Sequence, residues 1–208
     1  MTAGQIATRY RMPSSSGKPR VPVRVVVGTS QYAAHAVDIA RMVNDAYGYT
    51  RCSAEDITVR LQAGESAEPN RVLHLAVNNE DAVVGCASSS LSTAWTPSRC
   101  GHWGFLAVMR SEQKHGIAGA IVAAVEERLA AAGCQHVQIE YEFSPSSSHS
   151  QRLCAWYEGP LGYKRHSSWL TARLIGMLIG HQPKSEWRSC RKHLAPREPR
   201  DNTEREFI

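Results

Sequence analysis

A change of hydrophobic period within residues 116–143 constrains the fold more than any other feature of the chain. In residues 116–133, "GIAGAIVAAVEERLAAAG", apolar side chains recur every four positions, as on one face of an α-helix. In residues 136–143, "HVQIEYEF", apolar and polar residues alternate, as in a strand with one buried face. A helix followed at once by a half-buried strand predicts an α/β fold in which helices pack on a sheet. The residues that repeat along the helix are Ile117, Ile121, Val125 and Leu129.

Local signals elsewhere in the chain predict the remaining elements. Ser53 and Asp56 have the spacing of a capping box, so a helix is expected from Ser53 to Gly64, where the glycine ends it. The architecture that follows is a mixed central β-sheet flanked by helices on both faces. The other predicted elements are strands at 21–28 and 101–109, a hairpin at 71–92, helices at 30–48 (capped by Ser30) and 150–158, and a strand pair at 168–179.

Composition places the chain among globular proteins. It has 208 residues, of which 42 % are hydrophobic, and a net charge of +5. One folded domain is predicted at residues 21–179, between a flexible arm at 1–20 and a polar, charged tail at 180–208. The moderate positive charge suits an anionic ligand or partner. No apolar run approaches the roughly 18 residues of a membrane span.

The cysteines indicate a reducing compartment. None of the six forms a CxxC pair and several have apolar neighbours, so they are interpreted as core residues. Cys134 with His136 and Cys190 with His193 are isolated pairs, and no metal site is expected from them. Residues 1–20 carry four Lys or Arg residues and no acid, which resembles an organelle transit peptide. An ordinary arm is the preferred interpretation, and the protein is expected in the cytoplasm.

A polar turn at residues 113–119, "QKHGIAG", separates an apolar strand end from the clearest helix. It contains no carboxylate, and Gly116 and Gly119 leave its backbone open to close approach. The first amides of a helix have no partner within the helix, and the helix dipole favours an anion there. Lys114 and His115 add positive charge. The turn is therefore either a phosphate-binding loop or a plain strand-to-helix connection, and these residues alone leave both open.

Three segments together resemble the GNAT superfamily of N-acetyltransferases. Residues 113–118 match the superfamily's acetyl-CoA pyrophosphate loop: Gln or Arg, two residues, Gly, one residue, then Gly or Ala. "FLAV" at 105–108 is similar to its fourth strand, and "LCAWYEGPLGY" at 153–163 to its late helix, which carries a tyrosine. The resemblance runs over about residues 21–175, and the order of the elements agrees with it.

The resemblance implies how acetyl-CoA is held. Two departures from the superfamily pattern are Ser150, where an asparagine is frequent, and Arg110, where a proline is frequent. Ser150 is still expected to hydrogen-bond the cofactor. The backbone of Leu106, Ala107 and Val108 would pair with the pantetheine arm like an added strand. The pyrophosphate would be held by the loop residues Gln113, Lys114, His115, Gly116, Ile117, Ala118 and Gly119.

Acetyl transfer to an amine needs a base and a proton for the leaving thiolate. At pH 7, deprotonating an alkylamine with a pKa near 10 costs roughly 4 kcal/mol. His102, at the start of the predicted fourth strand, is one candidate base, because imidazole titrates near neutrality and some similar superfamily members carry a glutamate there. Glu140 and Glu142, on the polar face of the next strand, are the other candidates, although all three also fit solvated strand positions. Tyr157 is the general acid that the resemblance implies. Cys154 is disfavoured as an acyl-carrying nucleophile, because its neighbours are apolar.

These observations predict an N-acetyltransferase that moves an acetyl group from acetyl-CoA to a primary amine by direct attack. The alternative is a non-catalytic module of the same fold that binds acyl-CoA as a sensor. The basic segment at 188–200, "RSCRKHLAPREPR", suggests nucleic-acid binding, but its acids and its lack of interleaved aromatics favour a solvated terminus. The expected partner is a small-molecule or peptide amine, with no nucleic acid and no membrane, and a homodimer is left open.

Overall fold

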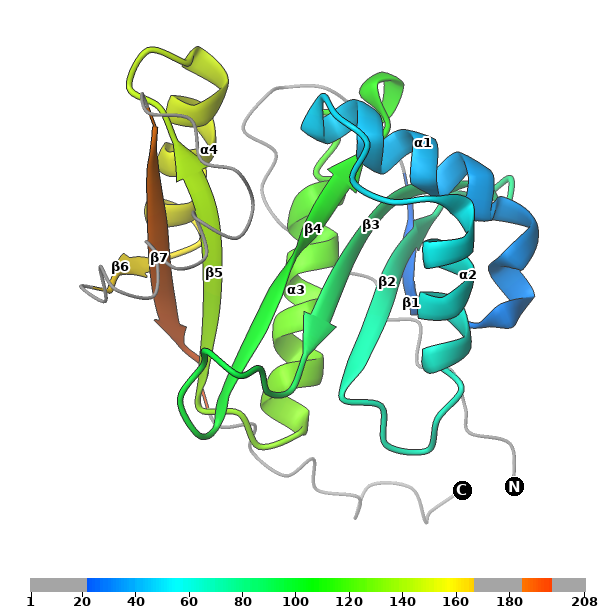
Figure 1. Cartoon of the computed structure of the whole chain (residues 1–208), viewed down its shortest axis with the longest axis horizontal. Helices are drawn as coiled ribbons and strands as arrows, with labels where there is room; N and C mark the ends of the chain where they lie inside the picture. Colours follow the sequence, from blue (N-terminus) through cyan, green and yellow to red (C-terminus); the bar gives the residue numbers. More distant parts are fainter. Residues whose placement is uncertain (1–21, 167–184, 196–208) are drawn as a thin grey trace, which may run out of the picture.

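A computed structural model describes residues 22–166 and 185–195. The predicted arm at 1–20 and the predicted strand pair at 168–179 lie outside the described residues. Within them the chain forms a seven-stranded sheet in the order β1-β2-β3-β4-β5-β7-β6 (Figure 1). All neighbouring strands are antiparallel except β4 and β5, which are parallel. The sheet is therefore mixed, as predicted.

Among the described residues, the sequence patterns predicted five of the seven strands and all four helices, the first helix with a different start. The strands are β1 Arg24–Val27, β2 Arg71–Val77, β3 Val83–Ser90, β4 Cys100–Val108, β5 His136–Phe143, β6 Lys164–Arg165 and β7 Glu186–His193. The helices are α1 Ala36–Tyr47, α2 Ala54–Ala63, α3 Ile117–Ala131 and α4 Ser148–Glu158, with short 3₁₀ turns η1 Ser30–His35 and η2 Arg110–Glu112.

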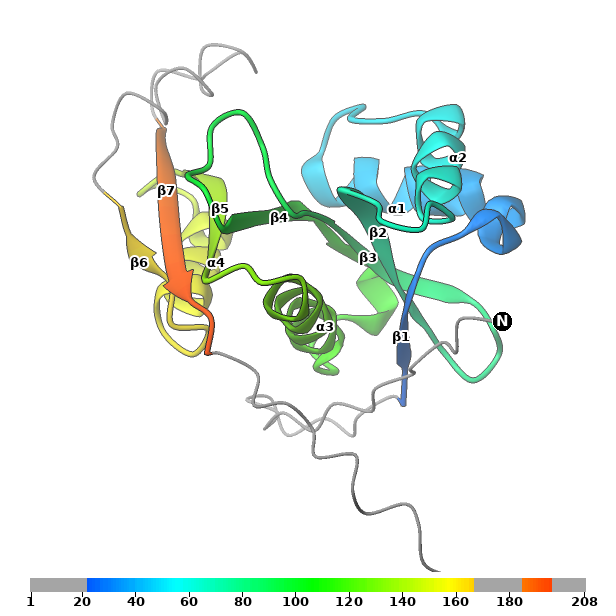
Figure 2. The same cartoon turned by 90° about the horizontal axis from the view of Figure 1, so that it is seen from below.

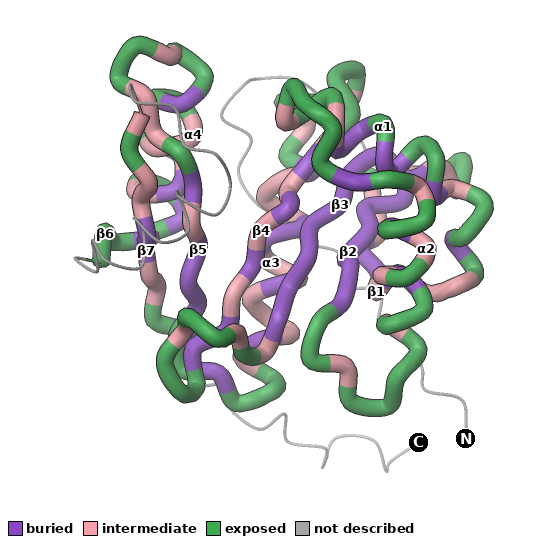
Figure 3. The backbone as a smooth tube through the Cα atoms, in the orientation of Figure 1, coloured by how far each residue is buried: buried purple, intermediate pink, exposed green. Residues whose placement is uncertain are grey.

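Helices cover both faces of the sheet. Figure 2 shows α1 and α2 on one face and α3 on the other. Each face has its own hydrophobic cluster, one with α1 and α2, and one with α3 and α4. The central strands β2 and β3 are buried along almost their whole length (Figure 3). In β4, a Cβ at Gly101 would lie 2.7 Å from Leu129, so this glycine lets α3 pack directly on the strand.

The observed helix ends can be compared with the capping signals predicted from the sequence. The capping box of α2 is present, because Ser53 accepts from the Asp56 amide and Asp56 accepts from the Ser53 amide. The predicted cap at Ser30 is wrong: the segment begins as the 3₁₀ turn η1 after Thr29, and α1 starts only at Ala36. Gly48 ends α1 in the left-handed region, with φ of 74°.

The predicted polar tail contains a strand of the sheet. β7 pairs with β5 along all eight of its residues and extends the folded part of the chain beyond residue 179. Its charged side chains find partners from distant segments: Arg188 contacts Glu158 at 3.4 Å, and Lys192 contacts Glu126 at 2.7 Å. Between them Cys190 is fully buried. The charges that make this segment resemble a solvated tail are thus ion-paired within the fold.

Candidate active site

The parallel strands β4 and β5 pair only at their beginnings. Their register holds three pairs, which are Cys100–His136, Gly101–Val137 and His102–Gln138. Beyond the last pair the strands diverge, and Figure 1 shows them well apart at their C-terminal ends. The β4 edge that faces β5 there has no strand partner among the described residues, and an unpaired edge of this kind can accept an added strand.

A β-bulge in β4 lies beside this divergence. The register with β3 shifts between Cys86 and Ser88, and Phe105 opposite has a positive φ of 62°. Trp103 packs on the α3 side, whereas Phe105 packs on the α1–α2 side and Leu106 on the α3 side again. The bulge therefore re-aims the strand where Leu106, Ala107 and Val108 are expected to meet pantetheine.

The turn before α3 is open to an anion. The first bond of the helix runs from the Ala120 amide to the Gly116 carbonyl at 3.1 Å, so the amides of Ile117, Ala118 and Gly119 have no carbonyl within the helix to bond. A Cβ added at Gly116 or Gly119 would have no neighbour within 4 Å. The predicted loop residues thus form an uncrowded backbone surface at the positive end of α3.

Side chains of the loop are placed around these amides. Nδ1 of His115 is buried without a hydrogen-bond partner in the part of the chain that the structure describes, and lies 3.9 Å from Glu112, too far for a hydrogen bond. Gln113 donates its side-chain amide to the Val108 carbonyl at 3.1 Å. Lys114 has a positive φ of 69°. A polar ligand at this turn would satisfy the His115 nitrogen, and pairing of a ligand with Val108 would compete with Gln113.

Two of the candidate bases form one pair. Nε2 of His102 lies 2.7 Å from Oε2 of Glu140, and their side chains are only 18 % and 6 % exposed. His102 belongs to the last β4–β5 pair and Glu140 lies two residues further along β5, so the dyad sits where the strands part. Gln138 donates to the other oxygen of Glu140, and Trp95 packs edge-on against the His102 ring at 5.7 Å. The arrangement fixes both the imidazole and the carboxylate.

Glu142 and Ser150 lie apart from the dyad. Glu142 is exposed and accepts a hydrogen bond from the Ser185 hydroxyl. Ser150 is 7 % exposed; its hydroxyl accepts from the Ser144 amide at 2.8 Å and donates to the Glu142 carbonyl at 3.3 Å. These bonds hold the β5–α4 connection. A contact between Ser150 and the cofactor stays a prediction.

Tyr157 lies in α4 beside the split, packed edge-on against Trp103 at 5.9 Å and tilted against Tyr141 at 5.1 Å. Burial first, and then the neighbouring phenol of Tyr47, raise the pKa of Tyr157 above its ordinary value. Tyr157 therefore keeps its proton at neutral pH. Cys154, on the same helix, contacts Arg188 at 2.9 Å and does not reach the dyad.

Three residues that the sequence patterns did not single out also belong to this region. Tyr47, at the end of α1, is held by a cation–π contact from Arg51 at 4.5 Å. Burial raises the pKa of Tyr47, while Arg51 and a hydrogen bond from the Phe105 backbone act against it. Gln138, two residues before Glu140 on β5, donates to the dyad, and Arg191 on the neighbouring strand β7 donates to Gln138. Only Gln138 had a usable signal, its place on the alternating polar face of β5.

Three further properties bear on the kind of site. Among residues 22–166 and 185–195, no three His, Cys, Asp or Glu side chains are grouped so as to hold a metal ion. In the same part of the chain, no helix is long and apolar enough to cross a membrane. All six cysteines are free thiols, and five are buried.

Comparison with known families agrees with this geometry. The model of the acetyltransferase (GNAT) family matches residues 37–163, which is more than half of the chain. The chain belongs to the GNAT family. The matched residues run from α1 to the residue before β6. They include the β-bulge in β4, the loop before α3, the His102–Glu140 dyad and Tyr157.

Solved structures share the GNAT fold at low sequence identity. An N-acetyltransferase from Staphylococcus aureus Mu50 aligns with a TM-score of 0.59 at 14 % identity, over 83 % of this chain and 99 % of its own. The GNAT domain of S. lividans PAT gives 0.59 at 15 %, over 83 % and 90 %. Aminoglycoside 6'-acetyltransferase type Ii gives 0.57 at 17 %, over 84 % and 99 %. No curated protein sequence matches the chain.

Proposed function

We propose that this GNAT protein transfers an acetyl group from acetyl-CoA to a primary amine by direct attack, through a ternary complex. The observation that carries the proposal is the His102–Glu140 pair, 2.7 Å apart and partly buried at the point where β4 and β5 separate. The His102 imidazole, beside an unpaired strand edge, would supply a base where the thioester would bind.

The donor would bind along β4 and the loop before α3. Leu106, Ala107 and Val108 would pair with the pantetheine arm, and the amides of residues 113–119 would bond the pyrophosphate. The open space at Gly116 and Gly119 and the unpartnered His115 nitrogen support this placement. Each amide bonded to a charged oxygen contributes roughly 1.5–3 kcal/mol.

Proton transfer would be divided between two residues. With Glu140 accepting from Nε2–H of His102, the other ring nitrogen keeps its lone pair and can take the proton of the attacking amine. The amine nitrogen bonds the thioester carbon, the carbon–sulfur bond breaks, and the thiolate leaves. Tyr157, whose raised pKa keeps its hydroxyl protonated, is proposed to protonate that thiolate.

Release of free thiol from acetyl-CoA, measured over a panel of primary amines, tests the proposal. His102→Asn and Glu140→Gln should lower kcat by roughly 10²–10⁴-fold, since both remove the positioned base. Glu142→Gln is the matched control, because this exposed carboxylate lies outside the dyad, and it should change kcat by less than threefold.

The thiol assay, together with thermal unfolding, distinguishes the enzyme from the alternative, an acyl-CoA sensor. A sensor would gain thermal stability with acetyl-CoA but release no thiol with any amine. Equal turnover of all the variants would instead refute the assigned base and leave catalysis to positioning alone.

A further inference from the structure

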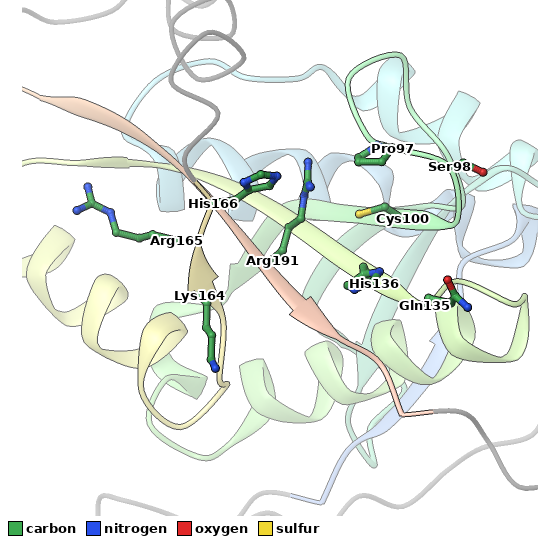
Figure 4. Close-up of a pocket in the computed structure, with 9 residues that line it drawn as sticks. All are labelled: Pro97, Ser98, Cys100, Gln135, His136, Lys164, Arg165, His166 and Arg191. Carbon is green, nitrogen blue, oxygen red and sulfur yellow. The ribbon is translucent and has the colours of Figure 1, made fainter.

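A cavity of about 580 Å³ lies between the start of β5, the β6–β7 edge and the loop before β4 (Figure 4). Five of its nine lining residues are basic and none is acidic. The basic residues are His136, Lys164, Arg165, His166 and Arg191, and the others are Pro97, Ser98, Cys100 and Gln135.

The basic residues are not equivalent. Arg165 is paired with Glu186 at 2.8 Å and, like Lys164, points away from the other side chains in Figure 4. Arg191 and His166 extend together toward the loop that carries Pro97. Burial and then the Arg191 charge lower the pKa of His166, which is consistent with their proximity. Arg191 and His166 are thus the two basic side chains that lie together on the Pro97 side of the cavity.

Arg191 is tied to the dyad by a row of side chains across three strands. His102, Gln138 and Arg191 are register partners on β4, β5 and β7. Nε of Arg191 donates to Gln138 at 2.5 Å, and Gln138 in turn donates to Glu140. The terminal nitrogens of Arg191 have no recorded partner among the described residues. With strands about 4.8 Å apart, the backbones of His102 and Arg191 lie about 10 Å from each other.

A polar group between the two ends of this row also lacks a partner. Ser189 is the register partner of Glu140, two residues from Arg191 on the same face of β7. It is 4 % exposed, and its hydroxyl has no hydrogen-bond partner within residues 22–166 and 185–195. A ligand that spanned the row from Glu140 to Arg191 would pass close to this hydroxyl.

We propose that the acceptor is an amine that also carries a carboxylate or a phosphate, and that Arg191 and His166 bind this anion while the amine faces His102 and Glu140. The proposal rests on the proposed function and names its substrate class. A guanidinium fixed through Nε presents its remaining donors as a planar fork, which matches two oxygens of one anion. The His102–Glu140 dyad would thus bind the amine end of a small molecule, and Arg191 and His166 would bind its anionic end.

Matched acceptors test this directly. The kcat/KM values are compared within three pairs of acceptors. The pairs are β-alanine and propylamine, 4-aminobutyrate and butylamine, and 2-aminoethyl phosphate and ethylamine. The acid of each pair should be preferred by about ten- to hundredfold, as expected for charge-assisted hydrogen bonds. The comparison of β-alanine with 2-aminoethyl phosphate distinguishes carboxylate from phosphate. Ratios near one in the wild type, with turnover intact, would overturn the inference and leave the proposed function standing.

Substitutions test whether the preference for acidic acceptors depends on Arg191. Arg191→Gln should bring the acid-to-amine ratio close to one, and Arg191→Lys should retain part of it, since charge remains without the fork. Lys164→Gln removes one positive charge from the register partner of Arg191 on β6, leaves the Arg191 and His166 side chains in place, and should keep the ratio. An equal loss in Lys164→Gln would mean diffuse attraction and overturn the assigned pair. Stabilisation by acetyl-CoA checks that each variant is folded.

Product binding gives a readout that needs no turnover. N-acetyl-β-alanine should raise the melting temperature of the wild type more than N-propylacetamide does, and Arg191→Gln should abolish the difference. Absence of thiol release together with this difference would refute the proposed function but support an anion site at Arg191. Absence of thiol release together with equal shifts would refute both.

Discussion

Tyr47 and Tyr157 belong to opposite faces of the sheet, yet the Tyr47 phenol contributes to the raised pKa of Tyr157. Tyr47 packs with the α1–α2 cluster and Tyr157 with the α3–α4 cluster. Burial is the larger cause of the raised pKa of Tyr157, and the Tyr47 phenol is the second. Of the two tyrosines, only Tyr157 was marked by its sequence context.

Tyr157→Phe is expected to lower kcat by roughly 10²–10⁴-fold if its proton transfer is coupled to thiolate departure. The ring packing on Trp103 and Tyr141 is retained, so affinity for acetyl-CoA should hardly change. Steady-state kinetics and calorimetric binding measure the two quantities. A loss of affinity equal to the loss of rate would indicate a packing role instead.

His74 makes stability depend on pH at the residue scale. It lies in β2, 3 % exposed, with Nε2 2.9 Å from the Ser89 hydroxyl. Burial, and then the Arg128 charge, lower its pKa from 6.5 to about 3. Below pH 6.5 His74 therefore binds a proton in the unfolded chain but stays neutral in the native state. The free energy of unfolding falls as the pH is lowered from 6.5 toward 3. At pH 5 the loss is about 2 kcal/mol.

Urea unfolding at pH 7 and pH 5 measures this dependence. His74→Gln removes the titrating group and should reduce the difference between the two free energies of unfolding by about 2 kcal/mol. Parallel pH profiles for the wild type and the variant would show that His74 titrates alike in both states.

Some strands and helices are predictable from the local hydrophobic pattern, whereas others form because of contacts with residues that are distant in the sequence. β5 and α3 were predicted because one face of each is apolar at the correct period. β7 was not, because the ion pairs that accommodate Arg188 and Lys192 come from α4 and α3, far away in sequence. The left-handed residue Phe105 has no sequence signal either. In the same way, the polar face of β5 indicated Glu140 as a candidate, but its contact with His102 depends on which strands become neighbours.

Gly116→Asp tests the loop before α3 as an element. The substitution adds a side chain and a negative charge where phosphate oxygens are expected, and should weaken acetyl-CoA binding at least tenfold. Gly133→Asp is a matched control at the other end of α3, since both glycines have φ of 83° and open space around a Cβ. Both variants carry similar backbone strain, but only the first should lose affinity. Equal affinities would reduce the loop to a simple turn.

At the scale of the whole molecule, the sheet consists of two blocks joined at one end. One contains β1–β4 with α1, α2 and α3, and the other contains β5, β6 and β7 with α4. Three β4–β5 pairs hold them together, as do the 2.6 Å bond from Trp103 to Tyr163 and the Tyr163–Glu126 bond at 2.8 Å. A ligand laid along β4 beyond His102 would contact both blocks without opening the sheet.

Hydrogen exchange can locate this ligand. Acetyl-CoA at 100 times its Kd should slow exchange by up to about 100-fold in peptides covering residues 103–108 and 113–119, where amides are proposed to gain partners. The exposed turn at 78–82 should be unchanged. Acetyl-pantetheine, which lacks the pyrophosphate, should protect 103–108 and leave 113–119 exchanging as in the free protein, because only the strand edge then has a ligand to bond. Protection of 113–119 by acetyl-pantetheine, or of neither segment by acetyl-CoA, would contradict the two-part placement, whereas the expected pattern would assign the strand edge to the thioester arm and the helix end to the phosphates.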